Sequence, residues 1–366
     1  MNTAPVPERR LHPAAPRYAV VVPTVGRPSL QSCLTALALA TEDVPPARVV
    51  VVHDRPGADG AVPELPLPDA LRGITTVVAG PARGPAAARN TGARLAGDAE
   101  WIVFLDDDVV PSPYWGAELA QDLAGRPDGV AAVAARIDVP LSEGRRPTDA
   151  ERNTAALATA RWITADMAVR PAALRRVGGF DERFRHAFRE DADLALRLLE
   201  DGWSLAQGSR RTAHPPRQGG RWLPVRQQSG NGDDVLMRRL HGPDWRDRAG
   251  APAGRLPRHR AITVAGLAAL GCALTGRHRA AALCGALWCA GTAEFTLARV
   301  LPGPRTRTEV LDMVLTSAVI PPAATWHWLR GLVAHRAARP LPPSPAPAAA
   351  APAAAPVPGT WREART

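Results

Sequence analysis

The sequence predicts an α/β fold in which a mostly parallel sheet is flanked by helices, followed by a C-terminal helical region. Short apolar segments alternate with helix-like segments along the first half of the chain, the order of a parallel sheet with helices on both faces. The apolar segments are continuous rather than alternating, as in strands buried on both sides. The clearest, Trp101–Leu105 (WIVFL), runs directly into Asp106, Asp107 and Asp108. Three carboxylates therefore stand where open α/β sheets bind their ligands.

The composition is that of a globular protein with a strong arginine bias. The chain has 366 residues, of which 46% are hydrophobic, and a net charge of +10. It contains no lysine, and its arginines are spread along the chain, so we do not infer a nucleic-acid-binding protein. The four cysteines form no C-x-x-C pair, and three of them lie inside apolar segments, which indicates small buried side chains in a reducing compartment. The N-terminus lacks the apolar segment of a secretory signal, so we expect a cytoplasmic catalytic domain.

The elements of the first half follow from apolar runs and capping residues. Ser29 can cap a helix, and Pro85 suits the first turn of another. We expect strands at Tyr18–Pro23, Arg48–His53, Ile74–Ala79, Trp101–Leu105 and Gly129–Ile137, and helices from Ser29 to about Ala40, Pro85 to about Leu95 and Ser112 to about Ala124.

The aspartate triplet is the first candidate for chemistry. Carboxylates packed this closely repel one another and raise each other's pKa unless a cation lies between them. Oxygen ligands suit Mg²⁺ or Mn²⁺, which share phosphate oxygens of a substrate. The plain alternative is a solvated acidic turn that ends the strand. The apolar lead-in favours a site for a divalent metal and a diphosphate.

Two further polar residues lie near predicted strand ends. Asp54 follows the second strand and can accept a hydrogen bond from a base or a ribose. Arg89 lies on the helix that begins at Pro85, and a guanidinium forks onto phosphate oxygens, although a solvated helix face is the commoner explanation of a lone arginine. The sequence has neither a G-x-G-x-x-G nor a G-x-x-x-x-G-K-[ST] motif, so a metal would have to handle the phosphates.

A second informative stretch covers residues 164–203. It predicts a short strand at Met167–Arg170, a short helix at Ala172–Val177 and a helix at Phe188–Asp201, with a strand at Ser204–Thr212 after it. Glu190, Asp191 and Asp193 fall in the first turn of the longer helix, where the helix dipole favours ionised carboxylates and can keep one ready as a general base. Plain dipole complementation explains acids at a helix start as well.

Together these stretches resemble family 2 glycosyltransferases of the GT-A fold, the nucleotide-diphospho-sugar transferases. The resemblance extends from about Tyr18 to Arg217 and rests on a set of motifs in one order: VVVPTVGRP, Asp54, GPAAARNTGARLA, FLDDD, GGFDERF and EDADLALRL. It implies a nucleotide-sugar donor and a divalent metal, Mg²⁺ or Mn²⁺.

The resemblance also implies roles for individual residues. Thr24 and Asp54 would contact the base and ribose, and Arg89 the diphosphate. Asp106 and Asp108 match the D-x-D pair, with Asp106 and Asp107 also on the donor side, and His214 falls where some relatives place another metal ligand. Asp191 matches the catalytic base, and we place Glu190 and Asp166 in the acceptor region.

The implied reaction is an inverting single displacement. Asp191 would deprotonate an acceptor hydroxyl of a surface glycan, lipid or metabolite, and the metal would stabilise the leaving diphosphate. Gln218–Trp222 fits the Q-x-x-R-W pattern of processive polysaccharide synthases, so a processive synthase is one alternative. A non-catalytic sugar-nucleotide-binding module is another, although such a module would need no base.

The C-terminal third carries three apolar stretches, Ala261–Thr275, Ala280–Ala298 and Val310–Val333. The first is short for a membrane span, the second contains Glu294, and the third is expected to break at Pro321-Pro322. Arginines before and after the first stretch conflict with two spans under the positive-inside rule. We therefore expect helices associated with the inner face of the cell membrane, with a soluble helical subdomain as the alternative.

The expected domain organisation has five parts. It consists of a disordered N-terminus (1–16), a glycosyltransferase domain (17–226), a connector with a short helix near Val235–Leu240 (227–257), a hydrophobic helical region (258–335) and a disordered Ala/Pro-rich tail (336–366).

Overall fold

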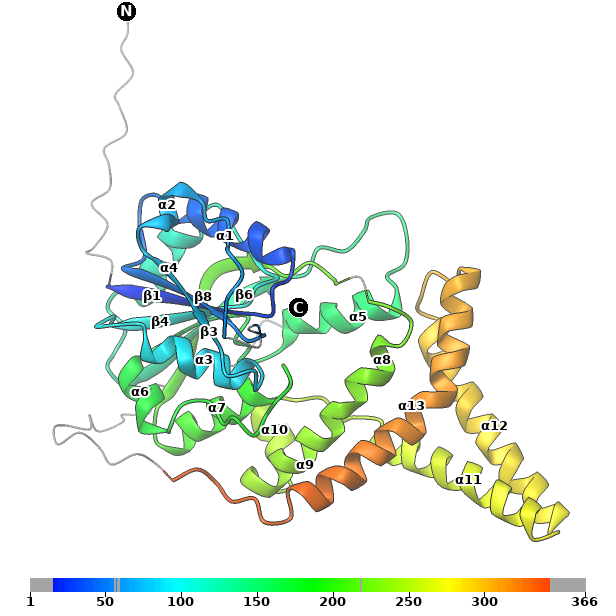
Figure 1. The fold of residues 1–366 in the computed structure, drawn as a ribbon. Coiled ribbons are helices and arrows are strands. Elements are labelled where there is room, and N and C mark those ends of the chain that lie inside the picture. The colour runs from blue at the N-terminus through cyan, green and yellow to red at the C-terminus, as the bar shows by residue number, and fades with distance from the viewer. Residues whose placement is uncertain (1–15, 56, 58–59, 218, 343–366) are drawn as a thin grey trace, which may run out of the picture.

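The computed structural model describes residues 16–55, 57, 60–217 and 219–342. Its centre is one eight-stranded sheet with the strand order β3-β2-β1-β4-β7-β6-β8-β5 (Figure 1). The strands are β1 (Tyr18–Thr24), β2 (Arg48–His53), β3 (Thr75–Ala79), β4 (Trp101–Leu105), β5 (Val110–Pro111), β6 (Val130–Asp138), β7 (Asp166–Val169) and β8 (Ser204–Ala213).

The first half of the sheet is parallel, as predicted. Strand β1 pairs in parallel with β2 and β4, and β2 pairs in parallel with β3. Along β1, Tyr18, Val20 and Val22 belong to one apolar cluster, whereas Ala19 and Val21 belong to the cluster on the opposite face. Both faces of the strand are buried, which is why its sequence is a continuous apolar run.

Helices cover both faces. The first cluster contains side chains of α1 (Ser29–Ala40), α2 (Asp69–Arg72) and α4 (Trp115–Leu123). The second contains side chains of α3 (Pro85–Arg94), α6 (Pro171–Arg176) and α7 (Glu190–Glu200). The sheet is therefore the middle layer of three.

The second half of the sheet contains the exceptions to the parallel order. Strand β7 lies antiparallel between β4 and β6, β8 runs parallel to β6, and β5 pairs antiparallel with β8 at the edge. The segment from β6 to β7 contains α5 (Asp149–Ala155) and the short 3-10 helix η1 (Ala156–Thr159). Thr148 caps α5 in a capping box with Glu151.

The chain continues through a set of helices that the figure shows below and to the right of the sheet (Figure 1). They are α8 (Leu223–Arg226), the 3-10 helix η2 (Gln227–Ser229), α9 (Gly230–His241), α10 (Trp245–Ala249), α11 (Leu256–Leu274), α12 (His278–Val300) and α13 (Arg307–Ala334). Helices α11 and α12 project away from the sheet, and α13 returns along α8 and α9.

Two parts of this region differ from the sequence expectation. Residues 227–257 are more than a connector, because α9 and α10 pack on α7 through Leu236, Met237 and Trp245. These few apolar residues, diluted by arginine, aspartate and glycine, are enough to dock two helices. Residues 336–342 lie against the same domain, where Arg183 Nη1 donates to the Arg339 carbonyl at 2.9 Å. The segments 1–15 and 343–366, expected to be disordered, lie outside the described residues.

Helix α13 is continuous through Pro321 and Pro322, where the sequence predicts a break. Proline removes a helical hydrogen bond and costs about 3 kcal/mol in a helix interior. Packing offsets this cost, since Ile320, Pro321 and Ala324 are buried against the neighbouring helices and Thr325 Oγ1 donates to the Pro321 carbonyl at 2.9 Å.

Among the described helices, α12 alone is long and apolar enough to cross a membrane, judged by length and composition. Its acidic residue, Glu294, is paired with Arg255 of the turn before α11 at 2.5 Å. The charge that counted against this stretch in the sequence is therefore partly neutralised within the helical pair.

Candidate active site

The ends of β1 and β4 meet through side chains of the segments that follow them. Thr24 Oγ1 donates to Asp107 Oδ2 at 2.7 Å, and Arg27 Nη1 donates to Asp107 Oδ1 at 2.7 Å. Asp107 is only 2% exposed, and burial raises its pKa despite these two donors. Thr24 and Asp107, both expected on the donor side, thus bind each other and fix the first loop to the aspartate triplet.

Asp54, at the end of β2, presents one free oxygen. Its Oδ2 accepts from the Gly84 backbone N–H at 2.7 Å, whereas its buried Oδ1 has no partner among the described residues. The backbone approaches closely here: a Cβ at Gly80 would lie 2.6 Å from Asp54 Oδ1. A buried acceptor without a donor is costly unless a ligand supplies one.

Asp108 lies beside His214 and Arg217 from the segment after β8. His214 Nε2 lies 3.7 Å from Asp108 Oδ1, and Arg217 Nε donates to Asp108 Oδ2. Burial pulls the pKa of Asp108 upward, but the Arg217 hydrogen bond and the charges of His214 and Arg217 outweigh it and hold that pKa below its usual value. These charges favour the ionised form of Asp108, and its buried Oδ1 has no hydrogen-bond partner among the described residues.

Arg89 is a bridge inside the protein. Its Nη2 donates to Asp106 Oδ1 at 2.7 Å and its Nη1 to Glu190 Oε1 at 2.9 Å, and the side chain is 2% exposed. The expectation of an open phosphate contact is corrected: both Nη groups already hold carboxylates. A guanidinium suits this task because its planar fork reaches two acceptors at once.

Glu190 and Asp191 begin α7 next to this bridge. Burial, strengthened by the charge of Asp191, raises the pKa of Glu190 to about 7, although Arg89 opposes the shift. Burial also raises the pKa of Asp191, whose Oδ1 accepts from the Ala192 N–H at 2.7 Å. The two carboxyl groups titrate as a pair, with a proton to take up near neutral pH.

Contacts from α9 and α10 hold the start of α7 in place. Arg189, the residue before Glu190, has a left-handed backbone with φ +77°. Such a conformation costs a non-glycine residue about 1–3 kcal/mol and persists only where the surroundings impose it. Arg189 Nε donates to Asp234 of α9 at 2.8 Å, and its guanidinium lies 4.9 Å from the Trp245 ring centre of α10. The helices after the sheet thus position the proposed base.

Asp166, expected in the acceptor region, is instead a buried structural acceptor. It is 0% exposed, and its oxygens accept from Arg210 Nε at 2.9 Å, Trp115 Nε1 at 2.6 Å and Thr212 Oγ1 at 2.6 Å. Arg210 also pairs with Asp122 at 3.1 Å. This ionic cluster joins three strands and α4 in the core and does not face a substrate.

The side chains near the aspartate triplet fit a divalent metal whose other ligands come from a substrate. Within the described part of the chain, no three His, Cys, Asp or Glu side chains converge closely enough to enclose an ion. Of the expected ligands Asp106, Asp108 and His214, the structure brings together Asp108 and His214, with an unpartnered carboxylate oxygen between them. Asp106 is engaged by Arg89. Two protein ligands leave the remaining positions to phosphate oxygens and water, as Mg²⁺ and Mn²⁺ sites commonly do.

Arg27 and Arg217 were missed by sequence reasoning. Both are partly exposed, at 40% and 45% of their side chains, and both pair with the aspartate triplet. In an arginine-rich sequence, the spacing of these two residues does not distinguish them from solvated arginines. The one available signal was position, since each follows a strand whose end faces the triplet.

A sheet between two layers of helices, with an aspartate triplet at the end of one strand and a carboxylate pair at the start of a helix, defines a GT-A-type transferase domain. Residues 19–184 match the profile of glycosyl transferase family 2. Over these residues the chain is similar to that family, and the protein is a glycosyltransferase. The fold and family predicted from the motifs are confirmed.

Solved structures agree with the fold. A mannosyltransferase of Pyrobaculum calidifontis, determined with GDP-Man and Mn²⁺, is 21% identical over 90% of each chain, with a TM-score of 0.50. GalNAc-T7, determined with UDP, GalNAc and Mn²⁺, is 14% identical over 66% of this chain and 55% of its own, with a TM-score of 0.41. That second likeness is too distant to carry an argument. No curated protein matches the sequence.

Proposed function

We propose that the protein transfers a sugar from a nucleotide-diphosphate donor to a hydroxyl acceptor with inversion, using a divalent metal. One observation carries this proposal: two groups of residues with different chemistry are linked inside one site. Ionised Asp108 lies beside His214, and Glu190 and Asp191 form a pair that can take up a proton. Asp106 and Arg89 connect the two groups. One side of this site suits a metal and a diphosphate, and the other a proton transfer.

On the donor side, the free Oδ1 of Asp54 would accept a hydrogen bond from the base or ribose. Asp108 and His214 would hold a divalent metal, which when bound supplies charge stabilisation to the leaving diphosphate. Arg27 and Arg217, partly exposed beside the triplet, would turn to the phosphate oxygens. The mannosyltransferase of similar fold, solved with GDP-Man and Mn²⁺, supports this arrangement.

On the acceptor side, Asp191 would take the proton of the attacking hydroxyl. Its raised pKa makes it a stronger base than an ordinary aspartate, and it lies at the start of α7 beside Glu190. Arg89 acts through the carboxylates that it orients and is a positioning residue. The acceptor class stays a surface glycan, a lipid or a metabolite.

The testing experiment is donor turnover by the purified full chain with a panel of nucleotide sugars. It compares Mn²⁺, Mg²⁺ and chelator for the wild type, Asp108→Ala and Asp191→Asn. We expect metal-dependent turnover of one donor, reduced about 10²–10⁴-fold in Asp191→Asn. Matched controls are Asp98→Ala, an exposed aspartate, and Asp201→Asn at the far end of α7, which should retain wild-type turnover.

Two other functions remain as outcomes of this experiment. Turnover that is equal with metal and with chelator would overturn the metal-dependent mechanism. Donor binding without turnover under any condition would indicate a non-catalytic nucleotide-sugar module. Long products from one acceptor would indicate a processive synthase, whose Q-x-x-R-W motif begins at Gln218, outside the described residues.

We further propose that the C-terminal helices associate with the inner face of the cell membrane. Helices α11 and α12 project from the catalytic domain, and only four of their residues, His259, Ile262, Phe295 and Arg299, are buried. Flotation with vesicles tests this proposal: the full chain should float with anionic vesicles, and a chain that stays in the dense fraction with every vesicle would contradict it.

A further inference from the structure

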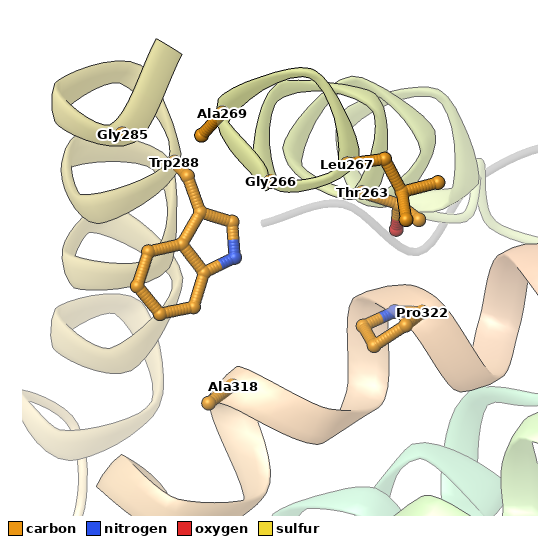
Figure 2. A pocket seen from close by; sticks show the side chains of 8 residues that line it. All are labelled: Thr263, Gly266, Leu267, Ala269, Gly285, Trp288, Ala318 and Pro322. Carbon is orange, nitrogen blue, oxygen red and sulfur yellow. The ribbon is translucent and has the colours of Figure 1, made fainter. Parts of the chain in front are cut away.

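A pocket of about 410 Å³ lies where α11, α12 and α13 meet (Figure 2). The volume is in the range of small-molecule sites, about 300–1,000 Å³. The Trp288 indole of α12 projects into the space between the three helices. The lining residues are Thr263, Gly266, Leu267, Ala269, Gly285, Trp288, Ala318 and Pro322.

The lining offers almost nothing to water. No charged side chain takes part, and the single hydroxyl, Thr263 Oγ1, already donates to the His259 carbonyl at 2.8 Å and lies 3.1 Å from Thr325 Oγ1. The Trp288 indole N–H is a further polar group of the lining, and the pocket is open to the surface; its mostly apolar wall suits an apolar ligand.

The outer surfaces of the same helices are also apolar. Leu270 is 58% exposed, Leu274 78% and Leu283 64%, and similar exposure continues along α13. Helices that are apolar on their outer as well as their inner faces belong in a hydrocarbon environment. The pocket is therefore walled by elements that face lipid, and the apolar ligand nearest to it is a lipid chain.

A cationic side chain lies one helical turn from the lining residue Thr263. The Arg260 guanidinium of α11 lies 4.0 Å from the centre of the Trp328 ring of α13. One turn further along α11, Thr263 contacts Thr325 of α13, so α11 and α13 contact each other at two successive turns. Arg260 pairs with no carboxylate among the described residues, in contrast to Arg255 and Arg258, which pair with Glu294.

We propose that this pocket binds an anionic membrane phospholipid, with one hydrocarbon chain between α11, α12 and α13 and the phosphate at Arg260. A cation stacked on a tryptophan one helical turn from a mostly apolar pocket is complementary to a molecule with one anionic end and one apolar body. The lipid is a ligand of the helical region and not the sugar acceptor, so this inference goes beyond the proposed function.

The experiment measures phospholipid bound to the purified full chain by native mass spectrometry. The probes are phosphatidylglycerol, which is anionic, and phosphatidylcholine with the same chains. The wild type should retain one phosphatidylglycerol in preference to phosphatidylcholine. Arg260→Gln should reduce that preference about fivefold, the effect of one basic residue at a lipid surface. Arg279→Gln, which removes the same charge at the far end of the α11–α12 hairpin, should not.

A second pair of variants tests the pocket itself. An added Cβ would meet nothing within 4 Å at Gly285, which lines the pocket, or at Gly271, which does not. Gly285→Leu should fill the pocket and weaken binding of both lipids at least about tenfold, because each excluded methylene loses its apolar contact. Gly271→Leu is the matched control and should bind as the wild type does.

Equal binding by Gly285→Leu and Gly271→Leu would overturn the pocket assignment. Equal loss of preference in Arg260→Gln and Arg279→Gln would overturn the phosphate assignment, since it would show attraction to the surface charge as a whole. Donor turnover is measured alongside. Lost lipid binding with intact turnover separates this proposal from the proposed glycosyl transfer.

Discussion

Asp106 and Glu190, which lie on opposite sides of the site, are held by one guanidinium. Arg89 donates to Asp106 Oδ1 at 2.7 Å and to Glu190 Oε1 at 2.9 Å. The metal side and the base side therefore share a buried link, and the geometry of one depends on that of the other.

Arg89→Lys tests this link. Lysine keeps the charge but has no planar fork, so it holds one carboxylate at a time. We expect kcat for donor turnover to fall about 10²-fold, the effect of a misplacement of about 1 Å at a reacting centre. The matched control is Arg94→Lys, an exposed position on the same helix. Equal kcat values for the two variants would show that the bridge has no catalytic importance.

The acid limb of the pH profile should report the Glu190–Asp191 pair. Burial raises the pKa of both groups, that of Glu190 to about 7. Below that pH the pair keeps its proton and the base is unavailable, so kcat/KM should rise as the pH increases through about 7. Glu190→Gln should shift the limb to lower pH, because it leaves one carboxyl group where two compete for a proton. An unchanged limb in that variant would assign the titration to another group.

The fold could be predicted from the sequence because a local pattern of residues indicates each strand and helix. Buried strands are continuous apolar runs, and the predicted strand at Trp101–Leu105 and helix at Ser29–Ala40 are observed at those limits. Positions within the site were also predictable, since strand ends converge at one edge of a sheet.

The sequence could not show which charged groups neutralise one another. Asp166 and Arg89 have the residue types of a site but bind charged partners within the protein, Arg210 and Glu190, which come from distant segments. The docking of α9 and the continuity of α13 through two prolines likewise depend on tertiary packing, which no local pattern records.

Asp166→Ala should destabilise the protein without a catalytic effect. It leaves the fully buried Arg210 with Asp122 as its remaining carboxylate partner and should cost about 3–5 kcal/mol of unfolding free energy. Chemical denaturation measures the loss, and kcat per folded molecule should match the wild type. A folded variant with reduced kcat would return Asp166 to the acceptor region.

His214→Ala should raise the metal requirement. His214 lies 3.7 Å from the ionised Asp108, and its loss removes one of two proposed protein ligands. We expect the Mn²⁺ concentration for half-maximal turnover to rise about 10–100-fold, with kcat partly restored at saturating metal. Thermal stabilisation by Mn²⁺ with a nucleoside diphosphate should weaken in parallel. His278→Ala, at the exposed start of α12, is the control, and the same Mn²⁺ requirement in both variants would exclude His214 as a ligand.

Arg299 of α12 should control the order of the segment between β6 and β7. Its guanidinium donates to Asp149 at 2.7 Å, Thr316 at 2.8 Å and Ser317 at 3.0 Å. Arg299→Met removes these bonds, so α5 keeps fewer contacts with the C-terminal helices, among them Arg152 Nη2 to the Arg299 carbonyl at 2.7 Å. The free energy of local opening across 148–155 should fall by about 1.5–3 kcal/mol, the contribution of a hydrogen bond to a charged group, as measured by amide hydrogen exchange.

The matched control for this variant is Arg307→Met, at the exposed start of α13. It removes an arginine from the same helical region without touching Asp149, and protection of 148–155 should stay at the wild-type level. Unaltered exchange in Arg299→Met would show that the Arg299 guanidinium does not set the order of α5, which would then rest on contacts such as Arg152 Nη2 to the Arg299 carbonyl at 2.7 Å and the Asp149 N–H to Glu309 at 2.8 Å.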